Sequence, residues 1–300
     1  KQRMQTKNRL LSLLLAAALV IVPMLTGLRA LAEEAPAGYF TLSVEKFTLG
    51  QGYLKEPAEI PFYQGETVGR GLARVLGTGN FKNSGVVGSE NDTITYLSAI
   101  KDEDDREPNP PAYIKDLAGE LGSRQAEGWL GEKDYASFSG WMYSVDNVSP
   151  AVGMGGYALK SGAVVRIQFT LAMGDLNGPA DAKNVDRGQL AKRIAFVNSA
   201  DNKDALLSDA AVKAAYDNAN AVMTDLTKDQ QQVDDAAAKL KAALPKTDSH
   251  TLTYDLNGGA GELPVDANVY QKGEYATLAS DKGMYSLEAK FFANWNTRPD

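Results

Sequence analysis

Few side chains in this 300-residue chain could do chemistry. The sequence has no cysteine and a single histidine, His250, which excludes thiolate nucleophiles, disulfides and multi-histidine metal sites. An unperturbed histidine suits proton transfer near neutral pH, but His250 directly follows the polar stretch 246–249, where we expect no pocket to organise it. We therefore predict no catalytic residue, no metal site and no cofactor.

Carboxylates are the other chemically capable groups. Five of them crowd into one Pro-rich segment: Asp102, Glu103, Asp104, Asp105 and Glu107. Two carboxylates at a suitable separation can hydrolyse glycosidic bonds, and carboxylate oxygens can bind calcium. The run lacks the glycine and the spaced oxygen ligands of a calcium loop. A solvated loop is the interpretation that the sequence favours, and we predict that the chain is not an enzyme.

Aromatic side chains are the candidates for binding. Trp141, Tyr143 and Val145 fall on one face of a predicted strand, and Met142 and Ser144 fall on the other. Flat apolar rings outside a core can stack on sugars or on planar ligands.

The predicted ligand-binding residues are therefore Trp141, Tyr143 and Tyr96. The alternative for Trp141 is that it fills the core between the sheet and its helices.

An export signal is predicted at residues 1–32. A basic head at residues 1–9 precedes an apolar stretch at residues 10–25, and Ala30-Leu31-Ala32 supplies the small residues of a cleavage site, which we place after Ala32. The alternative is a retained membrane anchor, but Pro23 interrupts a run that is already shorter than the ~20 residues needed to cross a bilayer. We expect no membrane span in the mature chain, which should be secreted or held at the cell surface.

The net charge of the mature chain limits the classes of partner that it can bind. Removing residues 1–32 takes 31 basic side chains to 26 against an unchanged 38 acidic ones, so the mature chain stands near −12. Such a surface repels phosphate backbones, which argues against nucleic acid and against a bare anionic membrane. With 44% hydrophobic and 23% charged residues, the composition is that of a folded protein, and the length suggests about two domains.

Residues 39–178 are predicted to form an α+β domain. Apolar residues alternate along two strands, at Phe40, Leu42 and Val44 and again at Val165, Ile167, Phe169 and Leu171. A helix is predicted over residues 67–76, with Thr67 as N-cap and Gly77 at its end, and a second over residues 113–121. Half-buried strands with two short helices indicate an α+β fold.

The composition changes after a Gly-Pro linker at residues 177–181. Apolar residues then recur at helical spacing, which predicts an all-α bundle of three helices over residues 185–245. We expect Ser208 to cap the second helix, Thr227 and Gln230 to form a capping box for the third, and Pro245 to end it. About 60 residues bury only ~60% of their unfolded surface, so this bundle should be marginal alone.

The last segment, residues 250–300, is predicted to be rich in strands. Leu252, Tyr254 and Leu256 alternate before the turn signal Asn257-Gly258-Gly259. A polar linker at residues 246–249 separates it from the helices, so the chain is predicted to be multidomain.

Three resemblances accompany these patterns. The stretches Gly-Trp-Met-Tyr-Ser-Val-Asp-Asn at 140–147 and Tyr-Ala-Leu-Lys-Ser-Gly-Ala-Val-Val at 157–165 resemble a bacterial domain family of unknown function that is similar to the C-terminal domain of transcobalamin. The resemblance implies a β-grasp-like α+β fold. It permits a face for a corrinoid, although the helical partner domain of transcobalamin is missing from this chain. The sequence departs from the family pattern at residues 161–163.

The two later segments resemble modules of exported proteins. Leu207-Ser208-Asp209 and residues 233–244 resemble the FIVAR module of surface proteins and glycan-acting enzymes. Residues 254–259, with Phe292 and Trp295, resemble a Listeria-Bacteroides repeat of the internalin B type, which implies a small β-grasp-like unit. We expect that repeat to be truncated, with the coding sequence continuing beyond Asp300.

These observations predict an exported, modular and non-catalytic protein of the Gram-positive cell surface or cell wall. The first domain would be the binding head for adhesion to a glycan or a surface protein, and the other two units would be spacers. Two alternatives remain open. The chain would be the ancillary region of a larger secreted glycan-degrading enzyme, or its first domain would capture a corrinoid such as cobalamin.

Overall fold

The computed structural model describes residues 35–88, 92–245, 249–256, 260–266, 269–271, 276, 278 and 284–285. The predicted export signal, Phe292 and Trp295 lie outside these residues. The chain divides into two compact units, Lys1–Ala37 and Gly38–Asp300, and the second contains nearly all of the described residues. No helix in the described part is long and apolar enough to cross a membrane.

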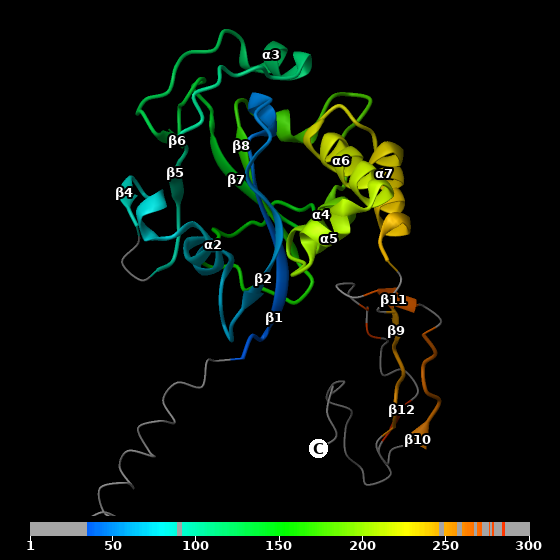
Figure 1. Ribbon diagram of the computed structural model, residues 1–300. Coiled ribbons are helices and arrows are strands. Elements are labelled where there is room, and N and C mark those ends of the chain that lie inside the picture. The colour runs from blue at the N-terminus through cyan, green and yellow to red at the C-terminus, as the bar shows by residue number, and fades with distance from the viewer. Residues whose placement is uncertain are drawn as a thin grey trace, which may run out of the picture. The chain divides into compact units, whose positions relative to one another are not determined.

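The centre of the second unit is a mixed four-stranded sheet in the order β2-β1-β8-β7 (Figure 1). Its strands are β1 (Gly38–Glu45), β2 (Tyr53–Phe62), β7 (Gly140–Val145) and β8 (Val164–Thr170). β1 pairs antiparallel with β2 and parallel with β8, and β7 pairs antiparallel with β8. The two strands predicted from the alternation of apolar residues therefore lie side by side in the middle of the sheet.

A second, antiparallel sheet has the order β4-β3-β5-β6. It is built from short strands: β3 (Phe81–Asn83), β4 (Val86–Val87), β5 (Leu97–Lys101) and β6 (Trp129–Gly131). Short 3-10 turns connect the elements, namely η2 (Phe47–Leu49), η3 (Thr78–Asn80) and η4 (Asp175–Asn177). Figure 1 shows this sheet and α2 (Val68–Leu76) on one side of the main sheet, with α3 (Ala112–Ala118) beyond the strand ends.

The helix predicted at residues 67–76 is confirmed as α2. The Thr67 hydroxyl accepts a hydrogen bond from the Arg70 N–H at 3.3 Å, and Gly77 ends the helix with a φ of 81°. Gly69 is required by close approach rather than by turn geometry, because a Cβ there would lie 2.0 Å from the carbonyl oxygen of Ile94. Glycine is a poor helix former, but at this position it lets α2 contact the loop that carries Ile94 directly.

The predicted apolar face of the main sheet is its core. Phe40, Val44, Val165 and Ile167 have 0% of their surface exposed, and Phe169 has 1%. Trp141 packs edge to face on Phe169, with ring centroids 5.2 Å apart. Sheets and helices together give the α+β content that the sequence predicts.

Four helices follow the strands, whereas the sequence pattern predicted three. They are α4 (Gly188–Asn198), α5 (Lys203–Ser208), α6 (Ala210–Thr224) and α7 (Gln230–Ala243). The predicted caps were wrong by one or two residues. Asp209, not Ser208, caps α6, and Asp229 with Gln232 forms the capping box of α7 in place of Thr227 with Gln230. Both pairs have the same spacing, and Asp229 has the extended backbone of an N-cap, with its carboxylate accepting from the Gln232 N–H at 2.8 Å.

The helices cover the second face of the main sheet, and α4 contacts β1, β2 and β8 (Figure 1). The Asn198 side-chain amide donates to the Pro57 carbonyl at 2.9 Å, and the Glu59 N–H donates to the Ser199 hydroxyl at 2.8 Å. The segment predicted as a linker is itself bonded, since the Asn184 N–H donates to the Asn177 carbonyl at 2.7 Å. The helical segment therefore packs against the sheet, although the sequence marks a boundary between the two.

Two short antiparallel pairs lie in the last segment. β9 (Ser249–Thr251) pairs with β11 (Val269–Gln271), and β10 (Ala260–Gly261) pairs with β12 (Met284–Tyr285). These pairs agree with the strand-rich composition of residues 250–300.

Candidate functional site

The face of the main sheet that α4 covers is polar. Residues that alternate with the apolar core set in β1 and β8 point to this side. They are nevertheless buried, with exposed fractions between 0% and 9%: Thr41, Ser43, Glu45, Arg166 and Gln168. On an uncovered sheet they would be in water, so the packing of the helices creates a polar interior.

One buried ion pair accounts for much of that interior. The Arg166 guanidinium donates to both oxygens of Glu45, at 2.9 and 2.8 Å, and the Ser43 hydroxyl donates to the same carboxylate at 2.6 Å. Burial alone would lower the pKa of Arg166, but the charge and hydrogen bonds of Glu45 outweigh it and raise that pKa. The pair neutralises itself, so its direct role is structural.

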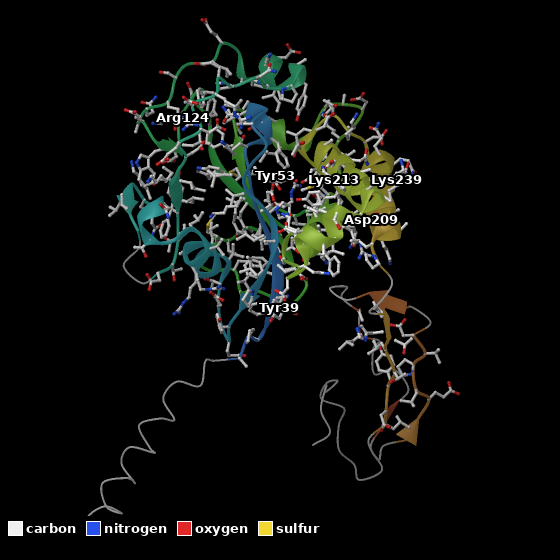
Figure 2. The ribbon with its side chains drawn as sticks, in the orientation of Figure 1. Tyr39, Tyr53, Arg124, Asp209, Lys213 and Lys239 are labelled. Atoms are coloured by element: carbon white, nitrogen blue, oxygen red, sulfur yellow. The ribbon has the colours of Figure 1, made fainter. Side chains whose placement is uncertain are left out.

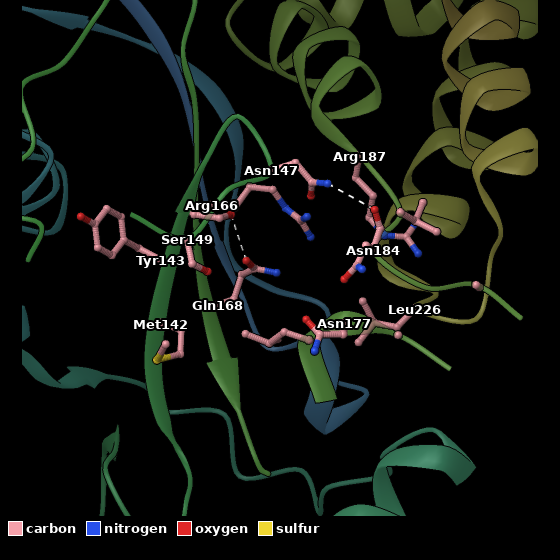
Figure 3. A pocket seen from close by; sticks show the side chains of 15 residues that line it. Met142, Tyr143, Asn147, Ser149, Arg166, Gln168, Asn177, Asn184, Arg187 and Leu226 are labelled. Carbon is pink, nitrogen blue, oxygen red and sulfur yellow. Dashed lines mark hydrogen bonds between the residues drawn. The ribbon is translucent and has the colours of Figure 1, made fainter. Parts of the chain in front are cut away.

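A polar cavity opens beside this pair, between β7–β8 and the segment that leads into α4. Its volume is about 140 Å³. Ser144, Arg166 and Gln168 form the strand side, and Asn184, Arg187 and Leu226 belong to the helical side (Figure 3). Hydroxyl, amide and guanidinium groups together can donate and accept hydrogen bonds in several directions, which suits a ligand rich in hydroxyl groups.

Arg187 holds the helical side of the cavity. Its side chain donates to the carbonyls of Val222, Asp225 and Lys228, at 3.3, 2.9 and 3.3 Å, around the end of α6. Arg187 is 3% exposed. Burial and the positive charge of Arg166 lower its pKa to about 10, with Glu45 and Asp225 only partly offsetting that effect. The guanidinium therefore stays charged near neutral pH, bonded to neutral carbonyl groups.

The rim of the cavity is more exposed than its floor. Asn147 has a positive φ of 63°, and its side-chain amide donates to the Asn184 carbonyl at 3.3 Å. Met142, 48% exposed, also lies on the rim. A ligand would meet exposed polar groups first and the two buried arginines last.

The structure brings only one of the three predicted ligand contacts to this cavity. Tyr143 lines it, half-buried, with its hydroxyl donating to the Val152 carbonyl. Burial, with a smaller contribution from Tyr157, raises the pKa of Tyr143. Tyr143 pairs with the core residue Ile167, so its ring lies on the opposite face of β7 from Ser144 and points away from the other lining side chains (Figure 3).

Trp141 lies in the core. It is 8% exposed, and its indole N–H donates to the Leu130 carbonyl at 2.8 Å. This placement agrees with the alternative in which Trp141 packs between the layers, because a buried indole offers no face to a ligand.

Tyr96 lies elsewhere on the surface. It is 53% exposed, and its hydroxyl donates to the Glu132 carboxylate. That hydrogen bond, together with burial, raises the pKa of Tyr96. Tyr96 is accessible to a partner but does not line the polar cavity.

The acidic run at residues 102–107 is largely paired with cations. Lys46 lies 3.1 Å from Asp102 and 2.7 Å from Asp104, and Arg124 lies 2.8 Å from Asp102. Hydrogen bonds from Arg106 and Lys46 hold the pKa of Asp104 well below its usual range, which disfavours a general acid there. Arg124, labelled in Figure 2, lies across the main sheet from Lys213 of α6, so this network is remote from the helices.

The remaining chemically capable group, His250, is exposed in β9 opposite Tyr270. In the part of the chain that the structure describes, no three carboxylate, histidine or cysteine side chains come together as a metal site.

Comparison with known proteins finds one family model that matches part of the chain. A family model described as a domain of unknown function (DUF4430) matches residues 79–171. The match falls inside the predicted first domain and covers β3 to β8 but neither β1 nor the helices α4–α7. No curated protein matches the chain.

Sequence reasoning missed the residues that line the cavity floor. The alternation that identified Val165, Ile167 and Phe169 as core also places Arg166 and Gln168 together on the opposite face, and that signal was available. Nothing in the local sequence indicates that Arg187 reaches the end of α6, because its partners lie 35 to 41 residues further along the chain.

Proposed function

We propose that this chain is an exported, non-catalytic binding protein of the cell surface whose first domain, residues 39–178, is the binding head for a glycan. The observation that carries the proposal is the polar cavity of about 140 Å³ lined by hydroxyl, amide and guanidinium groups. Sugars present many hydroxyl groups that both donate and accept, and a cavity with this mixture of partners satisfies them.

In this proposal the helical segment contributes to the binding site and is not only a spacer. Asn184, Arg187 and Leu226 belong to the segment after residue 178, yet they line the same cavity as Ser144 and Gln168. A binding head made of sheet and helices together follows from this arrangement. The resemblance of the helices to FIVAR and of the last segment to a Listeria-Bacteroides repeat adds the proposal that the head is displayed on an exported, modular chain.

The cavity argues against corrinoid capture as its own role. Sites that enclose drug-sized ligands measure about 300–1,000 Å³. A cavity of about 140 Å³ is too small for a corrin macrocycle. If the chain is instead the ancillary region of a larger glycan-degrading enzyme, it would bind glycans through the same cavity. The test below therefore applies to that alternative as well.

The test is a glycan array probed with residues 33–300. Gln168→Leu removes the amide from the cavity floor at nearly constant volume, and Tyr96→Phe makes a comparably small change at an aromatic residue outside the cavity. We expect binding to a defined set of glycans that Gln168→Leu abolishes and Tyr96→Phe preserves. Circular dichroism confirms that each variant is folded. An array without signal, or a pattern that Gln168→Leu leaves intact, would overturn the proposal.

A further inference from the structure

We propose that the polar cavity is selective for the carboxylate group of an acidic sugar, and that Arg187 is the residue that selects the charge. The inference rests on the proposed function and adds the ligand class. It is carried by a charge imbalance around the cavity, by the order in which polar groups line it, and by its size.

The imbalance arises because only one of the two buried guanidinium groups has a carboxylate partner. Arg166 is neutralised by Glu45 in a two-bond ion pair. Arg187 is 3% exposed, its hydrogen-bond partners among the described residues are carbonyl groups, and the charges of Glu45 and Asp225 offset the effect of burial only in part. A buried charge held only by neutral partners is costly, so an anion that reaches it gains both attraction and hydrogen bonds.

Arg187 also keeps donor capacity for a ligand. A guanidinium carries five N–H groups. Among the described residues Arg187 makes three hydrogen bonds, one from Nη1 and two from Nη2. Its Nε–H and one Nη1–H remain, and Figure 3 shows the side chain at the wall of the cavity.

The arrangement of buried and exposed polar groups along the cavity suits a sugar acid better than a simple carboxylate. Buried Arg187, Ser144 and Gln168 form the interior, whereas Asn147 and Asn184 on the rim are exposed. A ligand with an anionic end and several hydroxyl groups matches both zones. At about 140 Å³ the cavity is smaller than the ~300 Å³ of the smallest sites that enclose drug-sized ligands, so it takes the acidic end of one sugar while the rest of a glycan stays outside.

The test compares three probes with residues 33–300 by isothermal titration calorimetry near neutral pH: glucuronate, glucose and acetate. We expect glucuronate to bind at least about tenfold more tightly than glucose, because only glucuronate compensates Arg187, and more tightly than acetate, because acetate lacks hydroxyl groups. Added salt should weaken glucuronate binding and leave glucose binding unchanged.

The variants separate charge selection from folding. Arg187→Gln should abolish the preference for glucuronate, but Arg187 also bonds the end of α6, so this variant tests folding and selection together. Asn147→Asp leaves Arg187 in place. The side chain is exposed, and besides adding a negative charge the change removes the amide donor to the Asn184 carbonyl, so Asn147→Ala, which loses that bond without adding charge, is measured beside it. Asn147→Asp should weaken glucuronate binding about threefold or more and spare glucose. Asn218→Asp, the same change on the exposed side of α6, is the control and should alter neither affinity.

Each outcome decides between the two proposals. Equal binding of glucose and glucuronate, or an Asn147→Asp variant with unchanged preference, overturns charge selection and leaves glycan binding standing. Stronger binding of acetate than of glucuronate overturns the sugar acid as ligand class. Absence of binding to all three probes, together with a silent glycan array, overturns both proposals.

Discussion

The main sheet has an apolar face and a polar face, and the chain buries both. On the first, Phe40 and Phe169 pack with Trp141 under α2 and the second sheet. On the second, Glu45 and Arg166 pair beneath the helices, next to the polar cavity. Apolar side chains pack closely and leave no cavity for a ligand. Polar side chains need specific hydrogen-bond partners, and a cavity remains where the two packed segments do not fill the space between them. The apolar core therefore lies on one face, and the cavity that we propose as a binding site lies on the other.

The first prediction concerns a truncation that separates the helices from the main sheet, and its expected effect is the largest. A fragment of residues 179–245 should lose most of its helical circular dichroism signal, because α4 packs against β1 and β2 and a unit of about 60 residues is marginal alone. The fragment 38–245 is the control and should unfold in one cooperative transition. Two independent transitions in 38–245, with a folded 179–245, would restore the view of the helices as a separate spacer.

The second prediction concerns the apolar face. Phe169→Ala should lower the free energy of unfolding by about 4 kcal/mol, because it removes a ring that is 1% exposed and leaves Trp141 without its partner. Met142→Ala, at a side chain that is 48% exposed, should cost about 1 kcal/mol or less. Urea denaturation measures both, and equal costs would contradict the location of the core.

The third prediction concerns the ion pair on the polar face. Arg166→Met should cost about 3 kcal/mol, because it leaves the Glu45 carboxylate buried without its partner. Adding Glu45→Leu should recover most of that loss, since a buried pair can be replaced by apolar groups at little cost. Lys213→Met, which breaks the exposed pair with Asp217, should cost about 0.5 kcal/mol or less. A double variant as unstable as Arg166→Met would show that the pair itself stabilises the fold.

The fourth prediction concerns whether bound water reaches the buried polar face, and its expected effect on stability is the smallest. The Tyr53 hydroxyl is buried and has no hydrogen-bond partner among the described residues, and burial raises the pKa of Tyr53. Tyr53→Phe should therefore change the free energy of unfolding by no more than about 0.5 kcal/mol. Tyr216→Phe should cost about 1 kcal/mol, because its hydroxyl donates to Asn198 at 2.6 Å. A larger loss at Tyr53 than at Tyr216 would mean that bound water reaches this face.

The two faces also differ in how far the sequence predicts them. Alternation in β1 and β8 predicted which residues form the apolar core, and Thr67 with Gly77 predicted the limits of α2, because periodicity and capping depend on neighbours in the chain. The candidate site was mostly missed. Of the three aromatic residues predicted to bind ligand, Tyr143 alone is part of the cavity wall, with its ring on the opposite face of β7, while Trp141 is buried in the core. Aromatic type predicts a capacity for binding but cannot distinguish a core ring from an accessible one.

By itself the sequence determined the limits of α2, the core face of β1 and β8 and the negative charge, since each follows from local pattern or composition. Only the tertiary structure decided that the helices cover the polar face, so that Arg166 and Gln168 become buried and meet Arg187. The reason is that Arg187 reaches carbonyls 35 to 41 residues away, and a contact over that separation depends on how the elements pack. The cavity exists because two segments with different patterns share one interface.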